Sequence, residues 1–141
     1  MQLTGHAADL AAKIKDKSAN IAVVGMGYVG LPLAVEFAKA GYRVTGIDVT
    51  DERIDQINRG ESYSADGDGA ELSRLGADGR IKACRPGPEL GEADAISICV
   101  PTPLRKSKDP DISYIVSATE DVSKHVRSGQ LVVLESTTYP G

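Results

Sequence analysis

The sequence predicts an α/β fold with a doubly wound parallel sheet, and two observations carry this prediction. Short apolar segments alternate with segments of helical periodicity from Asn20 to the end of the chain. The first apolar segment, 20–24, also runs directly into a G-x-G-x-x-G turn at Gly25, Gly27 and Gly30. A strand, such a turn and a helix in this order are typical of a dinucleotide-binding unit.

The three glycines meet three physical needs. Gly25 lets the chain turn sharply off the strand, because glycine adopts backbone angles that a Cβ blocks. At Gly27 the main chain can approach a pyrophosphate, and at Gly30 the helix can pack closely on the strand. We expect the unpaired N–H groups at the start of this helix to bind the phosphates.

An acid at the end of the second strand predicts the cofactor. The helix after the glycines stops near Gly41, and the next strand, 43–48, ends in Asp48. Asp48 lies 48 − 30 = 18 residues past Gly30, close to the roughly 20 expected of a ribose-binding acid. A carboxylate there bonds the adenosine ribose and repels a 2′-phosphate, which favours NAD over NADP. The alternative is a glycine-rich turn beside which Asp48 only caps a neighbouring element.

The remaining segments continue the alternation. They are an expected helix ended by Gly60 (51–58), a polar loop (61–69), a short helix (70–75), a weak strand (81–84), a connection with room for one helical turn (86–92), a buried strand (95–100), a helix capped by Asp111 and ended by Gly129, and a second buried strand (131–135). Right-handed crossovers place the carboxyl ends of all parallel strands on one side of the sheet. We therefore expect the glycine turn, Asp48, the 101–103 segment and the 136–137 pair to share one crevice.

Composition narrows the class of protein. The length of 141 residues fits one domain, with a helical extension over 1–19 and the sheet over 20–141. A net charge of −4 without a basic cluster argues against nucleic acid and anionic membranes as partners. The N-terminus lacks the apolar core of a signal peptide, and we expect a reduced, cytoplasmic setting.

The two cysteines and the two histidines are not predicted to form a catalytic or metal site. The spacing of Cys84 and Cys99 is not that of a metal site, and Cys99 reads as a buried, inert thiol. His6 and His125 stand alone and are expected at the surface, so no metal site is predicted.

Five motifs in order give a more specific resemblance. They are VGMGYVGLPL (24–33), GID (46–48), VPTPL (100–104), PDIS (110–113) and LESTTYPG (134–141). Together they resemble the N-terminal domain of the UDP-glucose/GDP-mannose dehydrogenase family. Within that family, the combination of VPTPL (100–104) with LESTTYPG (134–141) is most similar to the UDP-N-acetylglucosamine 6-dehydrogenases.

The resemblance implies a set of residue roles. Gly25, Gly27 and Gly30, with the amides of Tyr28 and Val29, would hold the pyrophosphate. Asp48 would bind the adenosine ribose, and Arg53 would lie near the adenosine or remain a solvated helix residue. The segment Val100, Pro101 and Thr102 would flank the nicotinamide half of NAD. Ser136 and Thr137 would complete the cofactor site, with Thr137 also positioning a water or an acid for catalysis.

The resemblance also implies a reaction. Family members oxidise the C6 alcohol of a nucleotide sugar to a carboxylate with two NAD⁺, using a cysteine beyond the last residue of this chain. The substrate would be UDP-N-acetylglucosamine or UDP-N-acetylmannosamine, with UDP-glucose as the alternative. It would bind a C-terminal domain absent here, in a parent enzyme that forms a homodimer or larger assembly and supplies polysaccharide synthesis. We expect the chain by itself to be a monomer that binds NAD weakly and catalyses nothing.

Other classes of function are distinguishable. The 3-hydroxyacid and 6-phosphogluconate dehydrogenases share the glycine turn but lack the VPTPL and ESTTYPG combination. A stand-alone NAD-sensing module and a methyltransferase are further alternatives, and the methyltransferase leaves Ser136 and Thr137 unexplained. The polar segment 64–69 departs from the family pattern, so family contacts made there are in doubt.

Overall fold

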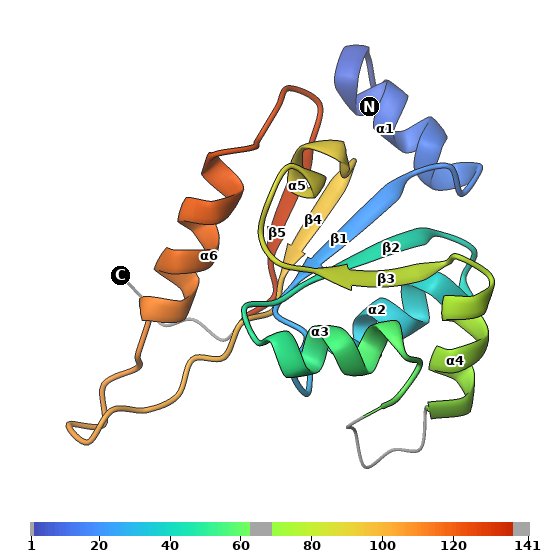
Figure 1. Ribbon diagram of the computed structural model, residues 1–141. Coiled ribbons are helices and arrows are strands. Elements are labelled where there is room, and N and C mark those ends of the chain that lie inside the picture. Colours follow the sequence, from blue (N-terminus) through green and yellow to red (C-terminus); the bar gives the residue numbers. More distant parts are fainter. Residues whose placement is uncertain (1, 63–68, 137–141) are drawn as a thin grey trace.

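One parallel sheet organises the molecule in the computed structural model, which describes residues 2–62 and 69–136 (Figure 1). Its strands lie in the order β3-β2-β1-β4-β5. They are β1 (Asn20–Val24), β2 (Arg43–Ile47), β3 (Ile81–Cys84), β4 (Ala95–Ile98) and β5 (Leu131–Leu134). Every neighbouring pair is parallel. The order reverses direction at β1, between β2 and β4, so the predicted doubly wound topology is confirmed.

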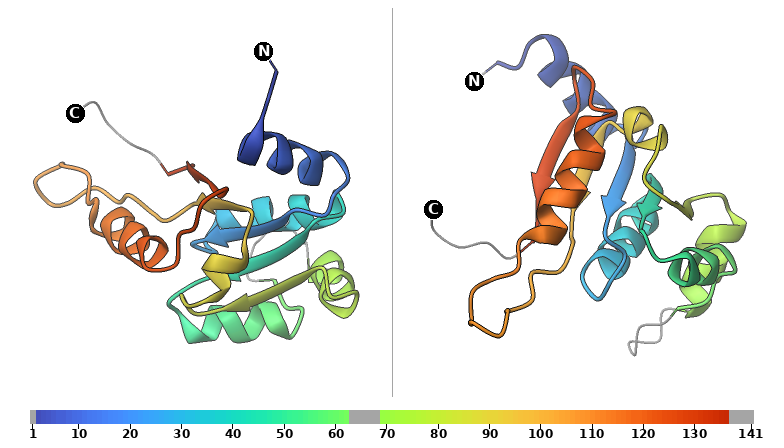
Figure 2. Two further views of the ribbon diagram at one scale, coloured as in Figure 1. Left: turned by 90° about the horizontal axis from the view of Figure 1, so that it is seen from above. Right: turned by 60° about the vertical axis from the view of Figure 1, so that its left-hand side comes forward.

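Helices bury the two faces of the sheet in two separate cores. Helices α2 (Gly30–Lys39), α3 (Asp51–Asn58) and α4 (Gly69–Ala77) contribute to the first core. Helices α5 (Glu89–Glu92) and α6 (Ser113–Ser123) contribute to the second. Figure 2 shows α6 beside the β4–β5 half of the sheet, and α3 and α4 near the β3 edge.

Most of the expected elements form close to the expected positions. The bounds of α3 and β3 agree with the sequence prediction, and α4 begins one residue earlier and ends two residues later than predicted. Gly41 follows α2 with φ +108° and Gly60 follows α3 with φ +75°, which explains why glycines end these helices. The N-terminal extension forms α1 (Gly5–Lys15).

A buried aspartate joins α1 to the sheet. The Lys13 ammonium donates to Oδ1 of Asp94 at 3.0 Å, and the Asn20 amide donates to Oδ2 at 2.8 Å. The Arg127 guanidinium approaches Oδ1 at 3.5 Å. Asp94 therefore connects α1, the start of β1 and the chain before β5.

The last strand differs from the prediction. The 131–135 segment was expected to be a buried strand, but β5 ends at Leu134 and its side chains are 36–44% exposed. β5 lies at the edge of the sheet, and the buried side chains of α6 belong to a core cluster that includes β4 but not β5. The apolar sequence of 131–134 predicts a strand correctly, but the burial of that strand depends on which elements pack against it.

The helix before β5 also ends earlier than predicted. α6 stops at Ser123, so Gly129 does not end it and Val126 lies beyond it in the connection to β5. The buried residues of α6 are Ala118 and Val122, while Ile112 and Val116 are exposed. β4 likewise ends at Ile98, two residues before the predicted end.

Candidate dinucleotide-binding site

The turn between β1 and α2 requires two of its three glycines for packing alone. Gly25 has φ +92°, and a Cβ there would lie 2.9 Å from the Val100 nitrogen. A Cβ on Gly30 would lie 1.7 Å from the Gly25 carbonyl oxygen. At Gly25 the positive φ and the main chain after β4 exclude a side chain, and at Gly30 the close approach of the helix to the turn excludes one.

Gly27 has a different surrounding. A Cβ there would meet nothing nearer than the Arg53 Nη1 atom at 3.8 Å, and the position has no positive φ. The fold of the chain therefore does not explain this glycine. A ligand lying against the main chain does explain it, so the turn fits a pyrophosphate.

The start of α2 faces the same space with its amide groups. Within the described residues, no side chain caps this helix at Val29. The Tyr28 and Val29 side chains are 86% and 60% exposed. The Leu31 and Leu33 amides donate to the Gly27 and Val29 carbonyls at 3.1 and 3.2 Å. The amides that can meet an anion are therefore those before Leu31, where the helix dipole also favours negative charge.

Asp48 lies next to this turn, at the carboxyl end of β2, and is 6% exposed. Its Oδ2 accepts a hydrogen bond from the Met26 amide at 2.9 Å, and its Oδ1 accepts one from the Thr50 amide at 2.9 Å. Arg53 Nη1 lies 3.7 Å from Oδ2. Each carboxylate oxygen has two acceptor sites, so Asp48 can hold the glycine turn and still accept bonds from ribose hydroxyls.

A crevice of about 330 Å³ connects these groups. It brings together six residues predicted from the sequence, namely Gly25, Gly27, Asp48, Arg53, Val100 and Pro101. An adjoining hollow of about 400 Å³ adds Tyr28 and shares Gly27 and Arg53. The crevice opens at the carboxyl ends of β1, β2 and β4, where the strand order reverses and ligands bind in such sheets.

The comparison with protein families decides the assignment. Residues 19–141 match the model of the UDP-glucose/GDP-mannose dehydrogenase family, NAD binding domain. The chain belongs to this family. The cofactor of the domain is NAD, in agreement with the carboxylate of Asp48 and the open space at Gly27.

Relatives with assigned activities support the family membership. The chain is 38% identical to the UDP-N-acetyl-D-mannosamine dehydrogenase of Escherichia coli K12 over 87% of its own length and 29% of that protein. It is 38% identical to the UDP-N-acetyl-D-glucosamine 6-dehydrogenase of Pseudomonas aeruginosa, over 89% and 29% of the two chains. The chain thus spans about 29% of the length of these curated relatives.

A solved structure in the family has the same fold. The UDP-D-ManNAc dehydrogenase of Pyrococcus horikoshii superposes with a TM-score of 0.80 at 39% identity, covering 86% of this chain and 29% of that chain. A 3-hydroxyisobutyrate dehydrogenase of Mycobacterium tuberculosis superposes with a TM-score of 0.55 at 22% identity, over 84% of this chain and 32% of that chain, which shows a shared fold alone.

Other predicted site residues lie outside the crevice lining. Val29 and Gly30 belong to the start of α2, and Thr102 belongs to the loop after β4. The Ser136 hydroxyl donates to the Val100 carbonyl at 2.8 Å and approaches the Ile98 carbonyl at 3.3 Å. In this structure Ser136 therefore holds the chain after β5 against the end of β4. Thr137 and the 63–68 part of the polar loop lie outside the described residues.

One wall of the crevice was not predicted from the sequence. Tyr114, Ser117, Ala118 and Asp121 of α6 line it. Their spacing of i, i+3, i+4 and i+7 places them on one face of the helix. This spacing was visible in the sequence, but the spacing alone does not tell which face of the helix meets the ends of the strands.

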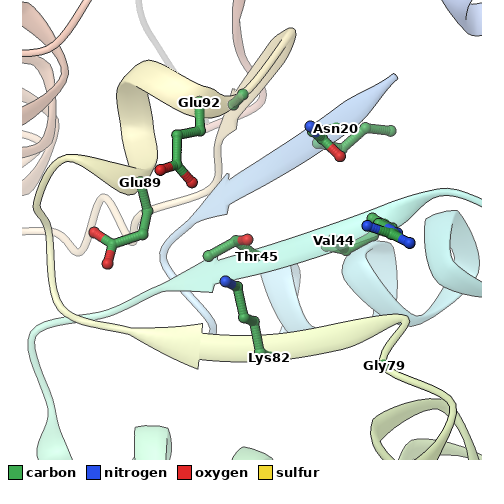
Figure 3. Close-up of a pocket in the computed structure, with 10 residues that line it drawn as sticks. Asn20, Val44, Thr45, Gly79, Lys82, Glu89 and Glu92 are labelled. Carbon is green, nitrogen blue, oxygen red and sulfur yellow. The ribbon is translucent and has the colours of Figure 1, made fainter. Parts of the chain in front are cut away.

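A second cavity lies over strands β1, β2 and β3 beside α5 (Figure 3). It has a volume of about 250 Å³, and none of the predicted site residues lines it. Figure 3 shows Glu89 and Glu92 extending from α5 toward β2, and Lys82 extending from β3. Arg43 also lines the cavity, so acidic and basic groups are balanced there. The short α5 leaves this part of the sheet face to polar side chains.

The two thiols are unsuited to nucleophilic chemistry in this chain. Cys99 is 6% exposed and Cys84 is half-buried. Burial raises the pKa of both thiols above the ordinary value, which keeps them protonated at neutral pH. No group of three or more His, Cys, Asp or Glu side chains within residues 2–62 and 69–136 is placed to hold a metal ion. None of the described helices has the length and apolar character needed to cross a lipid bilayer.

Proposed function

We propose that this chain is the cofactor-binding part of a nucleotide-sugar 6-dehydrogenase. The parent enzyme would oxidise the C6 alcohol of UDP-N-acetylglucosamine or UDP-N-acetylmannosamine to the uronic acid. The observation that carries the proposal is the open space at Gly27 beside the carboxylate of Asp48. The assigned activities of the E. coli and P. aeruginosa relatives support the substrate class.

The residues of the crevice have distinct proposed roles. The amides at the start of α2 would hold the pyrophosphate, and Asp48 would orient the adenosine ribose. Arg53 lies at the junction of the two hollows and would neutralise part of the phosphate charge. Val100, Pro101 and Thr102 would limit access of water to the nicotinamide half. When bound, NAD⁺ supplies the hydride acceptor for each of the two oxidations.

The wider setting is also a proposal. The UDP-sugar would bind outside residues 1–141, with Thr137 and Ser136 at the boundary of the active site. The 1–19 extension and the 20–141 domain would form one unit through Asp94 and its contact with Lys13. We place the enzyme in the cytoplasm, in polysaccharide precursor synthesis, as a homodimer or larger assembly.

Calorimetric titration of the chain with NAD⁺, NADP⁺ and S-adenosylmethionine tests the cofactor site. We expect NAD⁺ to bind and the other two ligands to bind more weakly. Asp48→Ala should weaken NAD⁺ binding by about 1–3 kcal/mol, because hydrogen bonds to a charged group are lost. Asp55→Ala, on the exposed face of α3, removes the same charge and should leave the affinity unchanged.

Two outcomes would contradict the proposal. Equal affinity of the Asp48→Ala variant and the unmodified chain would remove Asp48 from the ribose site. Preferential binding of S-adenosylmethionine would favour a methyltransferase instead. For the parent enzyme, turnover of each UDP-sugar should release two NADH per sugar, and a ratio of one would exclude oxidation to the acid.

A further inference from the structure

The crevice extends past Asp48 into a slot between the carboxyl ends of β2 and β3 and the helix α6. Val49 and Pro86 line this slot from the strand side, and Ala118 lines it from the helix. Figure 1 shows α6 standing opposite the ends of β2 and β3. The walls therefore present apolar surface to whatever enters between them.

The order of groups in a dinucleotide decides what enters the slot. Phosphates on the glycine turn and a ribose on Asp48 leave the base as the next group along the ligand. The base is attached to the ribose on the side away from the phosphates. An adenine ring is flat and apolar on both faces, which suits the walls formed by Val49, Pro86 and Ala118.

The slot also contains a carboxylate from α6. Asp121 lies one turn beyond Ala118 on the same face of the helix and lines the crevice. Its side chain is 25% exposed, and the ion pair with Lys124 is long, at 3.9 Å. The carboxylate of Asp121 therefore keeps acceptor capacity toward the slot.

We infer that Asp121 accepts a hydrogen bond from the 6-amino group of adenine and makes the site selective for adenine over a 6-oxo purine. This inference rests on the proposed NAD site. A 6-oxo purine presents a carbonyl at the same position, and two acceptors facing each other cannot bond. An asparagine there can turn its carbonyl oxygen toward a 6-amino group or its amide N–H toward a 6-oxo group, so it should not discriminate.

The test compares NAD⁺ with nicotinamide hypoxanthine dinucleotide, which carries the 6-oxo group, in calorimetric titrations of the full chain. The unmodified chain should prefer NAD⁺ by about tenfold or more, as expected for a hydrogen bond to a charged group. Asp121→Asn should reduce this ratio about tenfold or reverse it. Glu120→Gln removes a neighbouring charge from the exposed side of α6 and should leave the ratio unchanged.

The outcomes separate the inference from the function on which it rests. If Asp121→Asn binds NAD⁺ and keeps the preference of the unmodified chain, the adenine contact is wrong while the cofactor site stands. An equal loss of preference in Glu120→Gln would mean that helix charge alone sets the ratio, which also overturns the contact. Failure of the unmodified chain to bind NAD⁺ would overturn both proposals. Circular dichroism of each variant verifies that a changed ratio does not come from unfolding.

Discussion

Gly27 and Gly30 belong to one motif, yet a methyl group would meet different surroundings at each position. At Gly27 the nearest atom to an added Cβ is 3.8 Å away, whereas at Gly30 it is 1.7 Å away. Gly27→Ala should leave the free energy of unfolding within about 0.5 kcal/mol while weakening NAD⁺ binding by about 1–3 kcal/mol, because the methyl group occupies ligand space. Gly30→Ala should destabilise the fold by about 3 kcal/mol or more.

Chemical denaturation and calorimetry of the two variants measure both effects. The contrast between the variants is the informative quantity, since each substitution adds the same methyl group. A Gly27→Ala variant that unfolds as readily as Gly30→Ala would mean that Gly27 serves packing. One that binds NAD⁺ normally would place the pyrophosphate elsewhere.

The sequence predicted those site residues whose positions are set by elements that follow one another in the chain. The glycine spacing and the position of Asp48 follow from a strand, a turn and a helix that are continuous in the chain. The wall formed by Ser117, Ala118 and Asp121 could not be assigned in the same way. Its role depends on which face of α6 meets the ends of β2 and β3, and those elements are distant in sequence.

Among the elements, α3 protects an exposed strand edge. The Asn58 side-chain amide donates to the Ala83 carbonyl at 2.9 Å, and its oxygen accepts from the Ala83 amide at 2.8 Å. β3 is the edge strand on this side of the sheet, so Asn58 takes the place of a neighbouring strand at this one residue. Unpaired edges invite pairing with other chains.

Asn58→Ala should lower the free energy of unfolding by about 1–2 kcal/mol, because two hydrogen bonds are lost. Asn58→Asp should also destabilise, since a carboxylate cannot donate to the Ala83 carbonyl. Glu52→Ala changes an exposed position of the same helix and controls for helix propensity. Urea denaturation measures all three, and a stability of Asn58→Ala equal to that of Glu52→Ala would show that the edge contact contributes nothing.

The strands at the two edges explain the limits of element prediction. β3 was a weak apolar segment, yet its bounds were correct because α3 and α4 pack beside it and fix its place. β5 was a strong apolar segment, yet its burial was predicted wrongly. Apolar composition indicates that a segment tends to be buried. Among the described residues, however, β5 pairs with a strand on one edge only, and that strand is β4.

For the molecule as a whole, Asp94 couples α1 to the sheet in a manner that depends on pH. Burial by itself raises the pKa of Asp94, but the Asn20 amide and the Lys13 ammonium outweigh burial and hold the pKa below its usual value. A folded-state pKa below the unfolded one stabilises the fold above the unfolded pKa. This stability is lost as the pH falls through the folded-state value.

Asp94→Asn should therefore cost about 1–3 kcal/mol of unfolding free energy at neutral pH. The difference from the unmodified chain should shrink below about pH 4, near the carboxyl pKa of the unfolded chain. Denaturation across pH 3–7 measures this difference, with the exposed Asp78→Asn as the control. A difference that is constant across this range would show that the charge of Asp94 does not stabilise the fold.

The bond between Asp48 and the Met26 amide has a consequence for cofactor engineering. Converting a dehydrogenase to NADP usually begins by removing the acid at the ribose, so that a phosphate can enter in its place. Here the same carboxylate fixes the conformation of the loop that holds the pyrophosphate. A side chain at position 48 that cannot accept a hydrogen bond would admit the extra phosphate and at the same time release the turn. A successful conversion therefore needs a neutral side chain that still accepts from the Met26 N–H group, or a second substitution that supplies this acceptor.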